Sequence, residues 1–411
     1  ILLLGGNGCG LLWIPGNTGT QDNDRITLTL WYRNRSLDNH LLAQISRQFP
    51  SLHLQAIPIG GDFDAKFRTT LAGRSNVPDI VALNANIAGY FPDEDQFVDL
   101  RTLGADAIKK EYLGWKWNMA ITPGGRLIAL PIDTGPTALF YRHDLFQQAG
   151  LPADPETVSA QLSTWDAYLQ AGQRLQRVTH GKRYLLDDIS AVFQQCMSQS
   201  DWQFFDAFDH YIGDQSHVRR AWNYAIQAHQ LGLDAQAIPG STEWNAAVNN
   251  GTIASFVGAS WMKQRLLQAA PATAGRWRIA RAPGGAGNNG GSFLAITKYS
   301  AHPREAYAVM QWLLSPRHQA QSYVDNNLFP SALTSLEDPR FSGPEAFFGG
   351  QNTTQVFSQA AQQVKTSYFG PASDIVMRVF QLELSLVATQ NKPPKVAWSD
   401  AQQEIRRELS H

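Results

Sequence analysis

Strand-like and helix-like segments alternate through residues 26–84, and this order restricts the possible folds more than any other feature. The order is strand, helix, strand, helix, strand, at residues 26–33, 36–49, 53–59, 63–73 and 79–84. Ser36 is the expected N-cap of the first helix. The last strand contains the run IVAL, which is apolar throughout, as in a parallel strand buried on both faces. The pattern predicts an α/β fold with a doubly wound sheet and helices on both faces.

The length of 411 residues exceeds what one hydrophobic core normally covers, so we expect more than one folded unit. Charged residues make up 17% of the chain and the net charge is −1, without a long run of lysine or arginine. This balance argues against a nucleic-acid partner and against a charged membrane surface. The 12 tryptophans are more than cores usually need, and partly exposed flat rings mark binding surfaces.

The N-terminal residues 1–24 are interpreted as a targeting segment followed by a polar tether. The start ILLLGGNG is similar to the end of the apolar region of a signal peptide. Cys9 follows the small residue Gly8, as at the lipid-attachment site of bacterial lipoproteins, although Gly6 stands where a leucine is expected. A plain export signal and a membrane stub are the alternatives.

Three short places share a richness in proline or glycine, and each follows a predicted element. They are residues 131–136, 283–291 and 329–331. The first interrupts a predicted strand at residues 125–133 with two prolines and a glycine, which a regular strand does not accommodate. Such segments suit hinges, which absorb backbone rotation in a few residues while the units on either side stay rigid.

Six stretches then follow one another in a recognisable order. They are ITLTLWYRNR, NVPDIVALNA, GRLIALPIDTGPTALFYRHDLFQQAGL, STWDAYLQAGQRL, NNGTIASFVGASW and NGGSFLAITKYSAHPREAYAVMQWLLS. In this series the chain resembles the extracellular sugar-binding proteins of bacterial ABC importers, the family that includes maltose-binding protein. The resemblance covers most of residues 26–411, although residues 184–215, where the family usually places ligand contacts, match it poorly.

The resemblance implies a two-lobed periplasmic-binding-protein fold, with the three proline- and glycine-rich places as crossings between α/β lobes. It implies a first lobe of residues 25–132 and 286–329, and a second lobe of residues 133–285 and 330–411. A carbohydrate would bind in the cleft, the lobes would close on it, and the loaded protein would dock on the transmembrane subunits of an ABC permease. We expect a monomer outside the bacterial cytoplasmic membrane, without cofactor or metal.

A sugar presents many hydroxyl groups and some apolar C–H faces, so its site needs planar hydrogen-bonding side chains and aromatic platforms. Open α/β sheets bind ligands at the carboxyl ends of their strands. The resemblance implies contacts from the first lobe at Arg33, Asn34 and Arg35 after the first strand, and at Asn84 and Asn86 after the third. Taken alone, these five are ordinary turn residues.

Trp261, in the sequence GASW, is the strongest aromatic candidate, because the family often uses a tryptophan there as a stacking platform. The alternative is a tryptophan of the core. Trp202, in SDWQFF, is a second candidate. Its alternative role is to pack against Phe204, Phe205 and Phe208 on one helix face.

The glycine loop at residues 285–291 contains the spacing GxGxxG, but it precedes a strand instead of opening a helix. It is therefore not a dinucleotide-binding fingerprint. The backbone N–H groups of Gly290, Gly291 and Ser292 are expected to face sugar hydroxyls.

Asp133 and Thr134 lie in the first crossing, where we expect them at the floor of the cleft. A carboxylate there accepts hydrogen bonds from two sugar hydroxyls. The alternative is that Asp133 caps the turn or pairs with an arginine across the hinge.

Two rival functions remain open. One is a binding protein of the same fold for a non-sugar ligand, such as a polyol phosphate or a peptide, for which Arg33 and Arg35 supply positive charge. The other is a glycan-acting enzyme, which needs two carboxylates across a sugar. The adjacent Asp187 and Asp188 are interpreted as a solvated turn, and the usual catalytic motifs are absent.

Overall fold

The opening strands form a mixed five-stranded sheet in the computed structural model, which describes residues 25–410. The strands are β1 (Ile26–Tyr32), β2 (Leu52–Pro58), β3 (Ile80–Leu83), β4 (Leu130–Pro131) and β8 (Phe293–Ile296), in the order β2-β1-β3-β8-β4. β1 pairs in parallel with β2 and β3, so the predicted opening unit is confirmed. β8 runs antiparallel between β3 and β4.

The strand predicted at residues 125–133 is shorter than expected. Only Leu130 and Pro131 join the sheet as β4. Leu127 instead forms a bridge with Ile121, and Ile128 N donates to Ala120 O at 3.1 Å. The backbone groups of this stretch are therefore satisfied by a local hairpin and not by the sheet.

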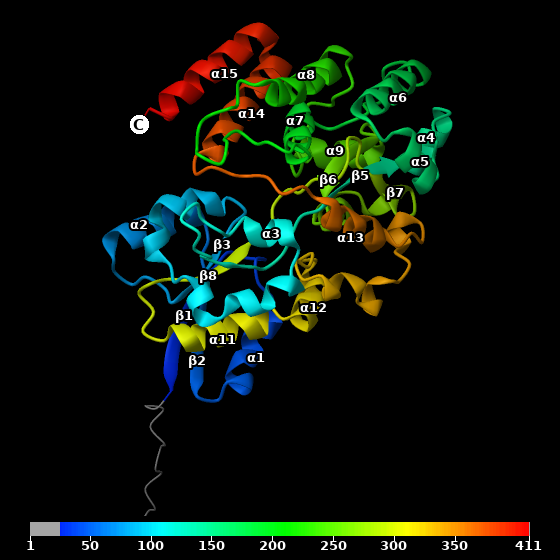
Figure 1. The fold of residues 1–411 in the computed structure, drawn as a ribbon. Coiled ribbons are helices and arrows are strands. Elements are labelled where there is room, and N and C mark those ends of the chain that lie inside the picture. Colours follow the sequence, from blue (N-terminus) through cyan, green and yellow to red (C-terminus); the bar gives the residue numbers. More distant parts are fainter. Residues whose placement is uncertain (1–24, 411) are drawn as a thin grey trace, which may run out of the picture.

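Helices flank the first sheet (Figure 1). They are α1 (Asn39–Gln48), α2 (Phe63–Gly73), α3 (Gly114–Asn118) and α11 (Pro303–Leu313), with 3-10 segments η1 (Ile87–Gln96), η2 (Leu100–Leu103) and η3 (Ala105–Glu111). Ser36 was the wrong choice for the N-cap of α1. Asp38 accepts from His40 N at 2.8 Å, whereas the Ser36 hydroxyl donates to Arg33 O at 2.7 Å and closes the turn after β1.

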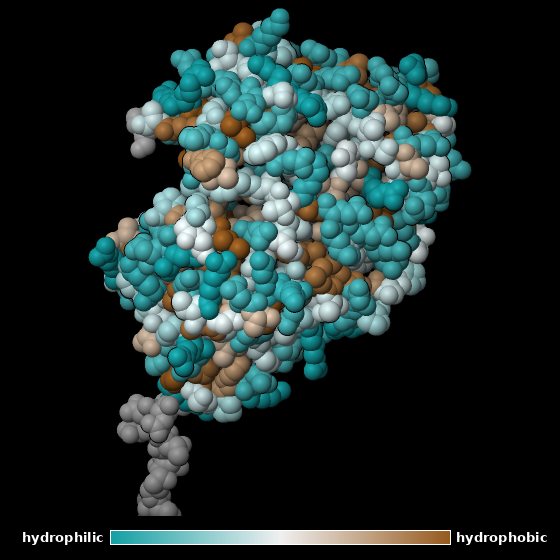
Figure 2. Space-filling view, viewed as in Figure 1, coloured by the Kyte–Doolittle hydropathy of each residue, from teal (hydrophilic) through white to brown (hydrophobic). Residues whose placement is uncertain are grey.

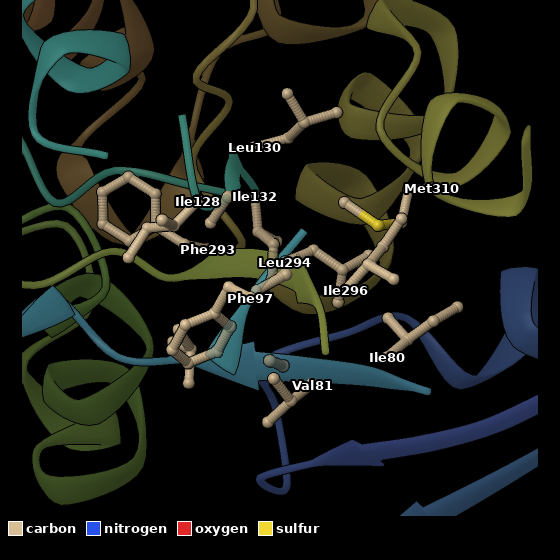
Figure 3. Packing of buried hydrophobic residues seen from close by; sticks show 14 of the residues in the cluster. Ile80, Val81, Phe97, Ile128, Leu130, Ile132, Phe293, Leu294, Ile296 and Met310 are labelled. Carbon is tan, nitrogen blue, oxygen red and sulfur yellow. The ribbon is translucent and has the colours of Figure 1, made fainter. Parts of the chain in front are cut away.

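A single hydrophobic cluster lies around this sheet and defines the first lobe. Ile80 and Val81 of β3 pack with Leu294 and Ile296 of β8 (Figure 3). All four residues of β3 are buried, as predicted for a strand that is covered on both faces.

The second lobe contains a three-stranded sheet in the order β6-β5-β7. Its strands are β5 (Thr137–Arg142), β6 (Ser255–Ala259) and β7 (Trp277–Arg281), and β5 is antiparallel to both neighbours. Every residue of β5 is buried. Leu139 and Tyr141 belong to one hydrophobic cluster, and Ala138 and Phe140 belong to another. This alternation shows that both faces of the sheet are covered.

Helices make up most of the second lobe, some of them against its sheet and others farther out (Figure 1). They are α4 (His143–Gln148), α5 (Pro155–Gln161), α6 (Trp165–Val178), α7 (Ile189–Ser198), α8 (Ser216–Gln230), α9 (Thr242–Asn250), α10 (Met262–Ala269), α13 (Thr353–Gln363), α14 (Ser373–Gln390) and α15 (Pro394–Glu408). Thr164 caps α6, because its hydroxyl accepts from Ala167 N at 3.1 Å.

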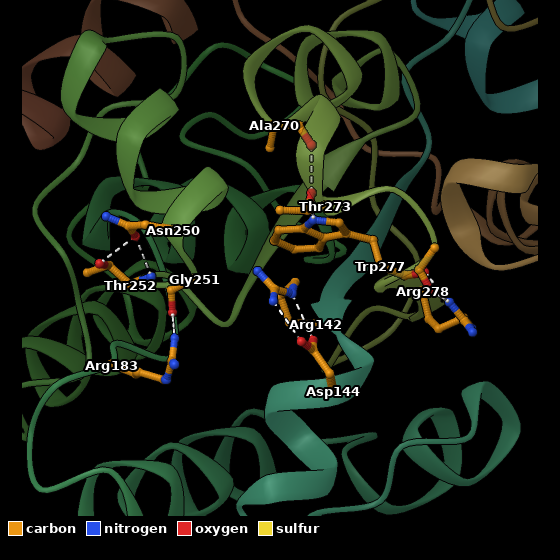
Figure 4. Close-up of polar contacts among 11 residues, drawn as sticks. Arg142, Asp144, Arg183, Asn250, Gly251, Thr252, Ala270, Thr273, Trp277 and Arg278 are labelled. Atoms are coloured by element: carbon orange, nitrogen blue, oxygen red, sulfur yellow. Dashed lines mark hydrogen bonds and ion pairs between the residues drawn. The ribbon is translucent and has the colours of Figure 1, made fainter.

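Buried polar contacts secure the far end of β5 (Figure 4). The guanidinium of Arg142 donates to both carboxylate oxygens of Asp144, at 2.8 and 2.7 Å. Trp277 Nε1 donates to Thr273 Oγ1 at 2.8 Å. Such bidentate and charge-assisted bonds satisfy groups that would otherwise be buried without partners.

The helix α12 (Pro316–Asn326) contacts both lobes. Ala320 and Tyr323 belong to a cluster of the second lobe, and Asp325 lies 3.9 Å from His40 of α1. The sequence-based residue ranges of the two lobes stay a prediction.

The connection between β4 and β5, residues 132–136, runs beside the connection between β7 and β8. Ile132 N donates to Ser292 O at 2.9 Å, and Asn289 N donates to Gly135 O at 2.8 Å. Gly135 N donates in turn to the side-chain oxygen of Asn288 at 2.8 Å. These hydrogen bonds connect the first predicted crossing, residues 131–136, to the second, residues 283–291.

The segment after α12 lies on the other side of the first connection. Thr134 N donates to Phe329 O at 2.8 Å, and Ser331 Oγ donates to Pro131 O at 3.1 Å. The side-chain oxygen of Gln319 in α12 accepts from Ser331 N at 2.8 Å. All three predicted places therefore meet at one hinge. Figure 2 shows an indentation of the surface between the two lobes.

Gly135 is the position where the hinge has least room. A Cβ there would overlap the carbonyl oxygen of Asn289, which is backbone. We expect Gly135→Ala to lower the free energy of unfolding by about 1–3 kcal/mol, measured by urea denaturation. Gly60→Ala is the matched control, since a Cβ at Gly60 meets nothing within 4 Å. Equal stability of the two variants would contradict this account.

Candidate functional site

The carboxyl ends of β1, β2 and β3 lie at one edge of the first sheet because the three strands are parallel. Arg33 follows β1, Asn84 follows β3, and Asp64 lies in the first turn of α2, which follows β2. Parallel sheets bind ligands at this edge. Residues that are far apart in the sequence are thereby brought together at the predicted place.

Asp64 joins these strand ends. Its carboxylate accepts from Asn84 Nδ2 at 3.0 Å and from Tyr90 Oη at 3.0 Å, and Arg33 Nη2 lies 3.4 Å away. The Arg68 guanidinium covers the Tyr90 ring, 4.3 Å from its centroid. Burial, followed by the negative charge of Asp64, raises the pKa of the Tyr90 hydroxyl well above its usual range. Tyr90 is therefore a neutral donor that orients the carboxylate.

Sequence reasoning missed Asp64, although a signal was present. It is an acidic residue just after the second predicted strand, at the same edge as the residues that were chosen. It was not predicted as a site residue because acidic residues are also common in the first turn of a helix.

The remaining first-lobe candidates differ in their surroundings. Asn34 and Arg35 are exposed, and Arg35 has a φ of 70°, so the chain turns sharply there. Asn86 is partly buried, and its Oδ1 has no hydrogen-bond partner within residues 25–410. A buried acceptor without a partner is costly unless a ligand or water supplies a donor. Their contact with a ligand stays a prediction.

Trp261 lies between β6 and α10, beside the glycine loop. Its Nε1 donates to Asn289 O at 3.0 Å, and the guanidinium of Arg265 lies 5.3 Å from the ring centroid. A Cβ on Gly290 would lie 3.5 Å from this indole nitrogen, so the two predicted site residues are neighbours. Trp261 is 36% exposed and is therefore not a core tryptophan, which was the alternative reading.

Trp202 is 58% exposed on the loop after α7. Phe204 and Phe205 are buried in the second lobe, so Trp202 does not share their packing. Exposure of this size leaves the ring available to a ligand. Whether Trp202 contacts one stays a prediction.

The predicted site residues of the first crossing, Asp133 and Thr134, form hydrogen bonds with the two neighbouring connections. Asp133 Oδ1 accepts from Ser292 N at 2.6 Å, so this backbone donor is already used. Thr134 is buried, and its hydroxyl donates to Pro330 O at 3.2 Å. Gly291 fits tightly against Asp133, because a Cβ there would lie 2.5 Å from its carbonyl oxygen. These contacts hold the hinge, and a role of these residues in ligand binding stays a prediction.

Lys116 of α3 is a second residue that sequence reasoning missed. It is fully buried, its Nζ has no hydrogen-bond partner within residues 25–410, and it lies 3.7 Å from the Phe293 ring centroid. Burial lowers the pKa of Lys116, and the nearby charge of Asp133 opposes this shift. Burial likewise raises the pKa of Asp133, opposed by Lys116. The basic side chain near Asp133 is thus a lysine, not the arginine considered from the sequence.

The interpretation of Asp187 as part of a solvated turn is wrong. Its side chain is buried and accepts from Trp244 Nε1 at 3.1 Å and from Asp188 N at 2.9 Å. Asp188 instead caps α7 by accepting from Ser190 N at 2.7 Å. The two carboxylates therefore perform separate structural tasks. Burial raises the pKa of Asp187 to about 7.

No group of three or more His, Cys, Asp or Glu side chains within residues 25–410 is arranged to hold a metal ion. None of the helices in this range is both long and apolar enough to cross a membrane. The predicted lipid-attachment residue, Cys9, lies outside the described residues.

Comparison with known proteins places the chain in a family. Residues 55–349 match the family described as bacterial extracellular solute-binding proteins. The chain is a bacterial extracellular solute-binding protein. The crystal structure of an extracellular solute-binding protein of family 1 superposes on this solute-binding protein with a TM-score of 0.89 at 28% identity, over 93% of this chain and 99% of that one. The two-lobed α/β fold is thereby confirmed.

Two curated relatives of this solute-binding protein have a named ligand. The lactose-binding protein of Rhizobium radiobacter is 25% identical over 296 residues, which span 67% of this chain and 65% of that protein. The arabinooligosaccharide-binding protein of Bacillus subtilis (strain 168) is 23% identical, over 97% of this chain and 95% of that protein.

The buried Asp187 predicts a pH dependence of stability. Its pKa in the folded state is raised above that of an unfolded aspartate, so its stabilising contribution is present at low pH. That contribution is lost as the pH rises through about 4 to about 7. We expect the melting temperature of the wild type to exceed that of Asp187→Asn by more at pH 5 than at pH 8. A constant difference would show that Asp187 does not titrate in this range.

Proposed function

We propose that this solute-binding protein captures a mono- or oligosaccharide between its lobes and delivers it to the permease of an ABC importer. The observation that carries the proposal is the group of hydrogen-bonding side chains around Asp64 on one lobe, together with the half-exposed Trp261 at the hinge of the other. Planar polar groups suit sugar hydroxyls, and an indole ring suits the C–H face. The lactose- and arabinooligosaccharide-binding relatives support this ligand class.

In this proposal, the first lobe supplies Arg33, Asn84 and Asp64, with Asn86 Oδ1 as a further acceptor. A ligand hydroxyl that donates to Asn86 would satisfy a buried oxygen that lacks a partner. Asn34 and Arg35 lie on the same loop and are assigned to the rim.

The second lobe and the hinge supply the other contacts. Trp261 and Trp202 are assigned as stacking platforms, and Gly290 lies against the first of them. Closure rotates the lobes about the three hydrogen-bonded connections, and the ligand favours the closed state because only there does it contact both lobes.

The rival functions have less support. The Arg33 guanidinium lies beside Asp64, so its charge is partly balanced and is less available to a phosphate. Asp187 is buried and Asp188 caps a helix, so these acids do not form a pair across a cleft. We therefore propose a binding protein without turnover.

The partner and the location follow from the same proposal. A permease with transmembrane subunits would receive the ligand, and the protein would act as a monomer on the outer side of the bacterial cytoplasmic membrane. Cys9 is proposed as the site of an N-terminal lipid anchor, which mass spectrometry of the native protein tests.

A thermal-shift screen tests the ligand class. A ligand that binds only the folded state raises the melting temperature by mass action. We expect at least one member of a panel of mono- to tetrasaccharides to raise it, and polyol phosphates and peptides to leave it unchanged. A shift with a phosphate ester and none with a sugar would contradict the proposal.

Trp261 is the sharpest single test of the site. With the sugar that gives the largest thermal shift, we expect Trp261→Ala to weaken binding at least tenfold, about 1.4 kcal/mol, measured by calorimetry. The matched control is Trp312→Ala, whose ring packs on His318 with centroids 4.0 Å apart, and it should bind normally. Unchanged affinity of the Trp261 variant would remove this residue from the site.

A further inference from the structure

The loop between α7 and α8 places one phenylalanine almost entirely in solvent. Phe208 is 80% exposed, whereas Phe204 and Phe205 of the same loop are buried. The reading of Phe208 as a packing residue of a helix face is therefore wrong. An isolated exposed ring needs no explanation by itself. Here, however, the hydrogen bonds of the surrounding turn hold the ring in solvent.

A hydrogen-bonded turn carries this ring. Asp206 Oδ1 accepts from Phe208 N at 2.9 Å and from His210 N at 3.0 Å, and its Oδ2 lies 3.1 Å from His210 Nδ1. Asp209 adopts a left-handed φ of 61°, and a bridge joins Phe205 to Tyr211. The turn is thus organised before any ligand arrives, which lowers the entropic cost of binding.

Hydrogen bonds connect the loop between α7 and α8 to the segment between α13 and α14. Tyr368 Oη donates to Asp209 Oδ1 at 2.6 Å, and Lys365 Nζ donates to Asp201 Oδ2 at 2.9 Å. A Cβ on Gly370 would lie 2.8 Å from Asp209, so the two segments are in close contact. Trp202 lies in the loop between α7 and α8, next to Asp201.

This segment faces the first lobe. Phe369 packs against the first-lobe cluster, and a Cβ on Gly89 of η1 would lie 3.7 Å from Pro371 O. In Figure 1 the segment leading into α14 runs along the side of the second lobe that is turned toward the first. The loop with Trp202 and Phe208 therefore lies at the junction of the lobes.

We propose that Phe208 and Trp202 form an outer subsite that stacks on sugar units beyond those held at Trp261. This inference rests on the proposed function and narrows its ligand class to oligosaccharides. Trp261 lies between β6 and α10 and is hydrogen-bonded to the glycine loop, whereas Phe208 projects from the loop between α7 and α8. One monosaccharide held at the hinge has no use for a second, preorganised aromatic platform. A longer oligosaccharide would contact both aromatic platforms.

Sugar chemistry suits this turn better than an apolar protein partner does. Asp206 and His210 place a carboxylate and an imidazole beside the Phe208 ring, whose centroid lies 6.2 Å from that of His210. An apolar platform edged by hydrogen-bonding groups matches the C–H face and the hydroxyl rim of a pyranose or furanose ring.

The test measures affinity against ligand length. The probes are two series, galactooligosaccharides and arabinooligosaccharides of one to five units, titrated by calorimetry. We expect Phe208→Ser to weaken binding of the longer members about fivefold and to leave the shortest binding member unchanged. Leu382→Ser is the matched control, because Leu382 is 59% exposed on α14 but lines a groove toward α15. It should not alter any affinity.

Two results would overturn the inference. One is unchanged affinity of Phe208→Ser at every length, and a transport defect in that variant would then assign Phe208 to contact with the permease. The other is an equal loss at every length, which would assign it to lobe closure. If the wild type binds no carbohydrate at all, the proposed function itself fails, so the two failures are distinguishable.

Discussion

The hydrogen bonds that residues 131–137 make on both sides determine how the two lobes meet. The backbone N–H groups of Ile132, Thr134 and Gly135 lie outside both sheets, so they need partners elsewhere. The neighbouring connections supply them: Ser292 O and the side-chain oxygen of Asn288 accept on one side, and Phe329 O accepts on the other. Gly135 is required because its neighbour leaves no room for a Cβ. The result is three hydrogen-bonded segments that join two lobes, each with its own core, which is the arrangement that the proposed closure requires.

The proposed site follows from this arrangement. Parallel pairing of β1, β2 and β3 brings their carboxyl ends to one edge of the sheet. There the Asp64 carboxylate contacts the side chains of Arg33, Asn84 and Tyr90. Trp261 is held beside the hinge by its bond to the second connection. In the proposed function, the polar group on one lobe and the aromatic groups on the other each supply part of the recognition. A ligand that needs both parts then stabilises the closed form.

Much of the fold was predictable, because it depends on local patterns. The βαβαβ opening and the three connections rich in proline or glycine were predicted and are confirmed. The predictions failed where a residue that suits one local role takes a different hydrogen-bond partner in the folded protein. Ser36 is a good cap residue, but its hydroxyl closes the turn after β1 while Asp38 caps the helix. Asp187 looks like a turn residue, but Trp244 and burial give it a different role.

The sequence by itself determined the class of fold, the hinge positions and the edge of the sheet where polar residues gather. Periodicity, turn residues and strand order act over short distances, so they can be read along the chain. Only the tertiary structure decided which side chains are available. It buried Lys116 beside Asp133, used the Thr134 hydroxyl within the hinge and left Phe208 exposed. Burial and hydrogen-bond partners depend on segments far apart in the sequence, so local sequence patterns do not predict them.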